Sequence, residues 1–417
     1  MSLAKNVEFL SRLPRLNGFN GLGAYGFGLD SRSPLAEVAD FGSNPGALRM
    51  FSFVPENLQK RPALVVVLHG CGQTAASYDV GAGWSTLASR YGFALLLPEQ
   101  RTSSNPNACF NWFNPADTAR DQGEARSIRQ MIARMVRDHK IDPHRIYITG
   151  LSAGGAMTSV MLATYPEVFA GGAIIAGLPF GIAANVREAV NAMMQPQPRS
   201  ARQLGDLVRG ASKHRGPWPK LSVWHGTADR TVNPANADEI VKQWLDVHRL
   251  PPAPMTSGVV DGHPHQVWWN ADGATTVECY TITDMGHGTP LGVAANDERY
   301  GVEGAFLIEA GISSSYHIAN FFGLTGRVRQ PKAEVADSPS AKLIPPVSPL
   351  SVAVPELAKT LRPLTAFEHR QEPRAERPAA PRPEPVREKR QRRAVDVSAV
   401  ITRALTAAGL MKDGSDD

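Results

Sequence analysis

The stretch IYITGLSAGG, residues 146–155, decides the fold, because a β-branched apolar run leads directly into a G-x-S-x-G turn. Such a turn holds its serine, Ser152, in a strained backbone between a strand and a helix, so that the hydroxyl projects into open space. Glycines are needed two residues before and after the serine, since side chains there would collide with the neighbouring strand and helix. The helix expected over 156–165 directs its N-terminal amides towards the same place, which favours developing negative charge. The pattern predicts a nucleophilic serine; an ordinary glycine-rich loop is the alternative.

Apolar, β-branched runs alternate with amphipathic segments on both sides of this turn. The alternation predicts a mostly parallel central sheet with helices on both faces, and the G-x-S-x-G turn within it indicates an α/β-hydrolase fold. The run at 63–68 is apolar at every position, as expected of a strand buried on both faces. The expected strands are 63–68, 93–100, 146–149, 169–181, the beginning of 221–232, and 277–283, with an edge strand before Pro55. The expected helices are 84–91, 121–138, 156–165, 235–248 and 315–322, while 182–216 is a partly helical lid or cap and 251–276 a hairpin.

The composition changes near residue 326. The 91 residues that follow hold 12 of the 33 prolines and carry 17 Lys and Arg against 12 Asp and Glu. This surplus of five equals the net charge of the whole chain, so residues 1–326 carry balanced charge. The balance gives no electrostatic reason to expect nucleic acid or an anionic surface as a partner.

Four segments are predicted from these patterns. A lead-in with a short helix covers 1–34, the α/β-hydrolase catalytic domain 35–326, a disordered, proline-rich and basic linker 327–395, and a short amphipathic helix 396–412. The last helix could dock on its own domain or on a partner. No apolar run approaches the roughly 18–20 residues that span a membrane. The N-terminus lacks the apolar centre and the cleavage site of a secretory signal, which favours the cytoplasm.

A serine nucleophile needs a base to take its proton and an acid to orient that base. In α/β-hydrolases the acid precedes the histidine along the chain. Asp229, in HGTADRTV, follows the end of an expected strand, and His287 lies in a glycine-flanked loop directly after another. Both positions are at the carboxyl ends of strands, the same edge of the sheet as Ser152. We therefore expect Ser152, His287 and Asp229 to form a catalytic triad.

Other acids and histidines compete for these roles. Asp238 and Asp284 are the alternative acids, although both are also consistent with surface positions. His225 is consistent with a buried, hydrogen-bonded structural residue. His263 and His265 lie in a turn rich in proline and glycine, where solvation is expected.

The end of the strand at 63–68 is the expected site of the oxyanion donors. This strand stops abruptly at His69-Gly70-Cys71-Gly72, and an α/β-hydrolase places one donor in the turn after such a strand. The amide of Cys71 is the expected donor there, and the amide of Ala153, directly after the nucleophile, is the other. The chain has three cysteines, an odd number that argues against a disulfide framework but leaves one bridge possible.

Five motifs taken in order resemble the poly(3-hydroxybutyrate) depolymerase family of serine esterases, which also includes feruloyl-esterase-like and acetylxylan-esterase-like members. They are LHGCGQ, CFNWF, GLSAGGAM, WHGTADRTV and MGHGTPL, and the resemblance covers about residues 35–325. It implies that Ser152, Asp229 and His287 occupy the family's triad positions and that Cys71 occupies the oxyanion position beside Ala153. It also implies that Cys71 and Cys109 match a cysteine pair that secreted relatives join as a disulfide; two free thiols are the alternative.

The resemblance implies hydrolysis of carboxylic esters, with polyhydroxybutyrate or 3-hydroxybutyrate oligomers as the leading substrates. Most of the family is extracellular, and its secreted members carry a signal peptide and usually a polymer-binding domain, neither of which is visible in this sequence. Soluble oligomers or other esters are therefore favoured over solid polymer. A feruloyl or acetylxylan esterase is the alternative on the same fold, and a non-catalytic scaffold with a partner-binding tail is the alternative from another class.

Two aromatic residues in the loop after Cys109 are candidates for binding substrate. Trp112 and Phe113 could line an acyl or monomer pocket, because an ester of a short aliphatic acid needs apolar walls. Plain core packing explains them equally well. No cluster of His, Cys, Asp and Glu has metal-ligand spacing, and no glycine loop has phosphate-binding form, so neither a metal nor a cofactor is expected.

Overall fold

The computed structural model describes residues 32–58, 60–196 and 198–326. Most of the predicted lead-in, the linker at 327–395 and the helix at 396–412 therefore lie outside the described residues.

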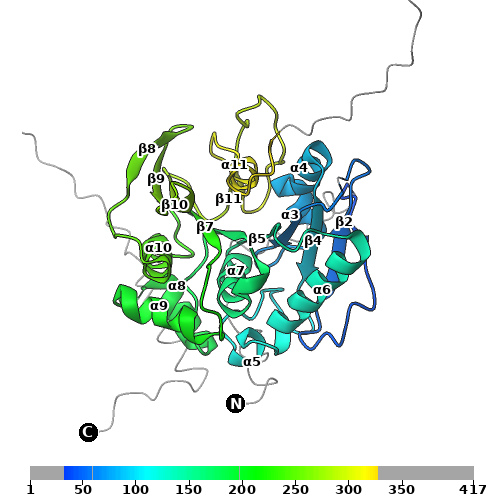
Figure 1. Ribbon diagram of the computed structural model, residues 1–417, viewed down its shortest axis with the longest axis horizontal. Helices are drawn as coiled ribbons and strands as arrows, with labels where there is room; N and C mark the ends of the chain where they lie inside the picture. Colours follow the sequence, from blue (N-terminus) through cyan, green and yellow to red (C-terminus); the bar gives the residue numbers. More distant parts are fainter. Residues whose placement is uncertain (1–31, 59, 197, 327–417) are drawn as a thin grey trace, which may run out of the picture. The chain divides into compact units, whose positions relative to one another are not determined.

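The described part of the chain is organised around a ten-stranded sheet (Figure 1). Six central strands run parallel, and antiparallel pairs complete the sheet on both sides. In their order across the sheet, the strands are β1 (Ala36–Glu37), β2 (Arg49–Phe53), β4 (Ala94–Glu99), β3 (Leu64–Leu68), β5 (Ile146–Leu151), β6 (Gly171–Ile175), β7 (Lys220–Gly226), β10 (Thr275–Ile282), β9 (His263–Trp269) and β8 (Thr256–Val260). Two short strands, β11 (Thr289–Leu291) and β12 (Leu307–Glu309), pair separately.

Both faces of the sheet are buried. Along β3, Leu64, Val66 and Leu68 belong to one apolar cluster, whereas Val65 and Val67 belong to the other. This alternation follows from the two-residue period of a strand, and it explains why every position of β3 is apolar. The first cluster includes side chains of α6 (Gly123–His139), α7 (Ala153–Thr164), α8 (Val186–Met194), α9 (Ala201–Gly210) and α10 (Ala235–His248). The second includes side chains of α3 (Ala75–Ala82), α4 (Trp84–Tyr91) and α11 (Ser314–Phe321).

The predicted fold class is confirmed, and α4, α10 and the hairpin β8–β9 lie where the sequence places them. The helix α3 was not predicted. Its sequence, AASYDVGA, shows no helical period because six of its eight residues are buried, so no side of the helix is left polar. Its beginning is fixed by Thr74, whose hydroxyl accepts a hydrogen bond from the amide of Ser77.

One further expectation, the loop at 101–118, differs in part from the structure, and the partly helical character of 182–216 is confirmed. The loop at 101–118 ends in a single helical turn, α5 (Pro115–Thr118), which begins at a proline and is capped by the side chain of Asn114. The partly helical segment at 182–216 forms α8 and α9, which bury Ala189 and Val208 in the first apolar cluster.

The connection between β5 and α7 is packed backbone against backbone. Ser152, between them, has φ 56° and ψ −117°, a conformation that an L-residue rarely adopts. A Cβ atom on Gly150 would lie 2.5 Å from the carbonyl of Gly154, and one on Gly154 would lie 2.4 Å from the carbonyl oxygen of Leu68. The two glycines are therefore required because backbone occupies the space of a side chain.

We predict that Gly154→Ala lowers the free energy of unfolding by at least ~2 kcal/mol, because the added methyl group clashes with backbone atoms, which cannot move as a side chain can. Gly210→Ala is the matched control: it lies at the end of α9, and a Cβ there meets no atom within 4 Å. Its expected effect is neutral or slightly stabilising. Chemical denaturation of both variants measures the difference, and equal midpoints would contradict the prediction.

Candidate active site

Ser152 stands at the carboxyl edge of the parallel sheet. Its amide donates a hydrogen bond of 2.9 Å to the carbonyl of Ile175, the last residue of β6. The preceding strand β5 and the following helix α7 are buried along their whole lengths. The strained backbone of the serine is thus held on both sides by packed elements.

His287 reaches this serine from a different part of the chain. It lies in the loop between β10 and β11, and its Nε2 is 2.9 Å from Oγ of Ser152. Its Nδ1 is 2.7 Å from Oδ2 of Asp229, which follows the end of β7. Because a carboxylate can only accept, Nδ1 carries a proton and Nε2 is the nitrogen that can take the proton of the serine hydroxyl.

The carboxylate of Asp229 is almost completely buried and fully hydrogen-bonded. Its Oδ1 accepts hydrogen bonds from the amides of Thr231, at 2.8 Å, and Val232, at 2.9 Å. Burial alone would raise the pKa of Asp229, but hydrogen bonds from His225 and His287, attraction to His287 and the bond from Val232 together hold that pKa well below its usual range. The group is therefore an anion that can orient and stabilise a charged imidazole.

The rival acids do not contact His287 in the described structure. The side chains of Asp284 and Asp238 are solvent-exposed; the amide of Asp284 donates to the hydroxyl of Thr227. The expected solvation of His263 and His265 is wrong, because both belong to β9. His263 is buried, with Nε2 2.7 Å from the carbonyl of Ala310, and the side chain of His265 is 16% exposed, with Nε2 3.2 Å from Oε2 of Glu278.

The turn after β3 brings Cys71 towards the nucleophile. A Cβ atom on Gly70 would touch Leu151 at 3.4 Å, so this turn packs directly against the end of β5. Buried His69 fixes the turn: Nδ1 faces the carbonyl of Gly70 at 2.8 Å, and Nε2 accepts from the amide of Gln100 at 3.1 Å. Burial lowers the pKa of His69 to about 4, so its imidazole is neutral.

The amides of Cys71 and Ala153, the expected oxyanion donors, make no backbone hydrogen bond in the described part of the chain. Ala153 is the first residue of α7, a position whose amide has no partner inside the helix. Donors of this kind at a helix N-terminus stabilise negative charge on a reacting carbonyl oxygen.

A disulfide joins this turn to the loop that follows β4. Cys71 and Cys109 are linked with an S–S distance of 2.08 Å and a Cα–Cα distance of 4.3 Å. Beside it, the amide of Gly72 donates to the carbonyl of Asn107 at 2.8 Å. Cys279 is a free, buried thiol, whose pKa burial raises to about 12.

The loop after β4 is also held by the buried carboxyl group of Glu124. Glu124, on α6, accepts hydrogen bonds from the amide of Asn111 at 2.9 Å, from the side chain of Asn111 at 2.7 Å and from the side chain of Gln100. Burial, and after it the charge of Asp117, raises the pKa of Glu124 to about 8. The hydrogen bonds fix the backbone immediately before Trp112.

Trp112 and Phe113 differ in their surroundings. Trp112 is only 9% exposed and belongs to the first apolar cluster, whereas Phe113 is half-buried against that cluster. Their rings meet edge to face, with centroids 5.5 Å apart. Phe113 is thus the more accessible of the two.

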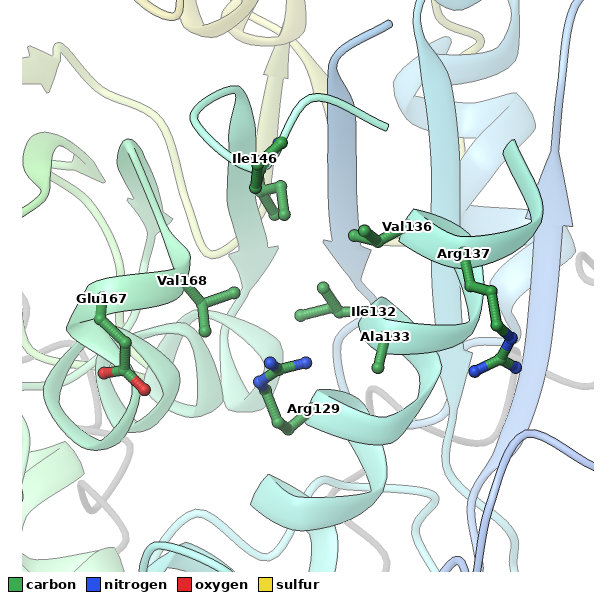
Figure 2. Close-up of a pocket in the computed structure, with 9 residues that line it drawn as sticks. Arg129, Ile132, Ala133, Val136, Arg137, Ile146, Glu167 and Val168 are labelled. Atoms are coloured by element: carbon green, nitrogen blue, oxygen red, sulfur yellow. The ribbon is translucent and has the colours of Figure 1, made fainter. Parts of the chain in front are cut away.

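A surface pocket of about 300 Å³ lies away from these groups (Figure 2). It is formed by α6, the beginning of β5 and the short helix η1 (Pro166–Val168). Ile146, which lines it, is the first residue of β5, whereas Ser152 follows the last one. Since the pocket opens at the opposite edge of the sheet, it is not where Ser152 acts.

Within the described residues, no group of three or more His, Cys, Asp and Glu side chains is arranged to hold a metal ion. None of the described helices combines the length and the apolar character that crossing a membrane requires.

Several known proteins are similar to this chain in sequence. The family model described as "Esterase PHB depolymerase" matches residues 50–254. Poly(3-hydroxyalkanoate) depolymerase C of Paucimonas lemoignei is 47% identical over 293 residues, which are 70% of this chain and 70% of that protein. The chain belongs to the esterase PHB depolymerase family. Feruloyl esterase B of Talaromyces stipitatus is 31% identical over 280 residues, covering 65% of this chain and 76% of that protein.

A solved structure has the same fold. The acetyl xylan esterase from Aspergillus awamori superimposes with a TM-score of 0.60 at 23% identity, and covers 70% of this chain and 100% of its own. At that identity the likeness concerns the fold alone. The sequence matches, however, confirm the family resemblance, and membership in the family makes the chain a carboxylic ester hydrolase.

Sequence reasoning missed two parts of this esterase site. Thr231 and Val232 hold Asp229 through backbone amides, which leave no mark on residue identity. Glu124 was not singled out within the helix expected over 121–138, although it anchors the loop of Trp112. Glu124, the second residue of α6, is buried by the fold, and a buried carboxyl group needs hydrogen-bond partners.

We predict that breaking the disulfide lowers the free energy of unfolding by about 3–4 kcal/mol, since it closes a loop across 38 positions. Cys71→Ser, Cys109→Ser and the double variant should lose similar amounts, because each removes the same bond. Reduction should lower the melting temperature of the wild type and leave that of the double variant unchanged. Equal sensitivity of the wild type and the double variant to reductant would contradict the bond.

Proposed function

We propose that this chain hydrolyses carboxylic esters through an acyl-enzyme formed on Ser152. The observation that carries the proposal is the unbroken line of hydrogen bonds from Oγ of Ser152 through His287 to Asp229. The contacts suit the reaction: the serine hydroxyl faces Nε2 of the imidazole, and the Nδ1–H of the same ring faces a buried carboxylate.

In the first half-reaction, His287 takes the proton of Ser152 as the oxygen attacks the ester carbonyl. The imidazolium that results is stabilised by Asp229, which also fixes the ring. The oxyanion is held by the amides of Cys71 and Ala153, and His287 then gives its proton to the leaving alcohol. In the second half-reaction, His287 activates a water molecule, which attacks the acyl-enzyme and releases the acid and Ser152.

We propose short-chain hydroxyalkanoate esters, polymeric or oligomeric, as the substrates. The poly(3-hydroxyalkanoate) depolymerase C of Paucimonas lemoignei, at 47% identity over most of the domain, supports this choice over the feruloyl esterase at 31%. Phe113 is proposed to form an apolar wall for the acyl group or monomer, with Trp112 packed behind it. Feruloyl or acetylxylan esters remain the second candidate, supported by the feruloyl esterase relative and by the shared fold of the acetyl xylan esterase.

We predict that Ser152→Ala and His287→Ala each lower turnover by about 10⁴–10⁶, because the members of a triad act as a unit. Asp229→Asn should cost about 10⁴, since the amide no longer stabilises the imidazolium or fixes its tautomer. Stopped assays with p-nitrophenyl butyrate measure all three. Asp284→Asn is the matched control for the acid, and it should stay near wild type. A Ser152→Ala variant within tenfold of wild type would refute the mechanism.

We predict that the enzyme hydrolyses 3-hydroxybutyrate dimers and trimers faster than methyl ferulate or acetylated xylan. Initial rates on this panel, together with amorphous polyhydroxybutyrate, test the substrate class, and Ser152→Ala serves as the blank. The ratio of polymer to oligomer rates decides between a depolymerase and an oligomer hydrolase. A preference for ferulate or acetyl xylan would keep the mechanism and replace the substrate.

A further inference from the structure

A second histidine contacts the acid of the proposed triad. His225, the penultimate residue of β7, has a side chain only 4% exposed. Its Nε2 lies 3.1 Å from Oδ2 of Asp229 and 3.0 Å from the carbonyl oxygen of Val232. The same Oδ2 receives the Nδ1–H of His287. One buried carboxylate oxygen therefore lies between two imidazoles.

The surroundings of His225 fix where its proton is. A carboxylate and a carbonyl can only accept, so Nε2 of His225 carries the proton and donates to both. Its Nδ1 is buried and has no hydrogen-bond partner in the described structure. Protonation of Nδ1 would bury an N–H group and a charge without an acceptor, which is costly. His225 is thus a neutral donor.

Resting on the proposed function, we propose that His225 is a positioning residue of the ester-hydrolysing site, which holds the carboxylate of Asp229 in the orientation that His287 needs. The amides of Thr231 and Val232 hold only Oδ1. His225 supplies the remaining constraint, on the oxygen that faces His287. A neutral donor suits this task, because it restrains the carboxylate without cancelling the charge that stabilises the imidazolium.

The role has a consequence for the pH dependence of activity. Without the donor at position 225, Oδ2 becomes a stronger acceptor for His287, which raises the pKa of the imidazole and moves the acid limb of kcat/KM to higher pH. The carboxylate is also less fixed, which lowers turnover. The titratable groups that interact with His225 and Asp229 are His287, from the loop after β10, and Asp238, from α10. Both residues are retained when His225 is substituted, so a moved acid limb reports the loss of the donor.

Two substitutions separate hydrogen bonding from packing. His225→Phe keeps an aromatic ring but has no donor, whereas the side-chain amide of His225→Gln can donate from the place of Nε2. For His225→Phe we expect the acid limb to move up by about half a unit to one unit and turnover on the pH plateau to fall by about tenfold. For His225→Gln we expect the acid limb to stay at the same pH as in the wild type, because the amide still donates to Asp229. His248→Phe, which removes another buried histidine bonded to a backbone carbonyl, is the control and should not move the limb.

The test measures kcat/KM for p-nitrophenyl butyrate from about pH 5 to pH 9, with melting temperatures of all variants. In the Asp229→Asn background, His225→Phe should have no further effect, because the carboxylate through which it acts is gone. An unmoved acid limb in a folded His225→Phe, or equal limbs in His225→Phe and His225→Gln, would overturn the positioning role alone. An Asp229→Asn variant with nearly full activity would instead overturn the proposed triad, and the role of His225 with it.

Discussion

The rest of the site depends on the contact between backbone and backbone at the connection from β5 to α7. There the carbonyls of Leu68 and Gly154 occupy the space that side chains on Gly154 and Gly150 would need. This close approach allows the chain to turn at Ser152 with a positive φ, and the packed strand and helix on either side hold the strain. The position of the Ser152 hydroxyl is therefore fixed, and the other groups of the site have to lie within hydrogen-bond reach of it.

The parallel sheet places those groups. Because the central strands run in one direction, the residues that follow β5, β7 and β10 meet at one edge of the sheet. Three loops distant in sequence can therefore supply Ser152, Asp229 and His287. The register of β7 and β10, which pairs His225 with Thr281, brings the loop of the acid beside that of the base. His225 uses the same register to reach the carboxylate from within the strand.

A second set of contacts connects the oxyanion turn to the wall of the site. The turn after β3 is tied to the loop after β4 by the Cys71–Cys109 disulfide and by the pairing of His69 with the amide of Gln100. Gln100 also bonds to Glu124, which in turn binds the backbone and side chain of Asn111. The proposed oxyanion donor and the aromatic pair that follows Asn111 are thus held by one connected network of buried polar groups. Such networks are rigid when every member has a partner.

The sequence by itself determined the fold class and the turn at Ser152, the proposed nucleophile, because strand burial and the glycines of G-x-S-x-G are local requirements that appear in residue identity. It also predicted Asp229 and His287 from their places after strands. The structure alone decided which polar groups surround them: that His225 bonds to Asp229, that Glu124 anchors a loop, that Cys71 and Cys109 are joined, and that α3 is a helix. The first three depend on partners distant in the chain, and the helix α3 is buried on nearly all sides. Distant partners and burial on all sides leave no periodic or local pattern in the sequence.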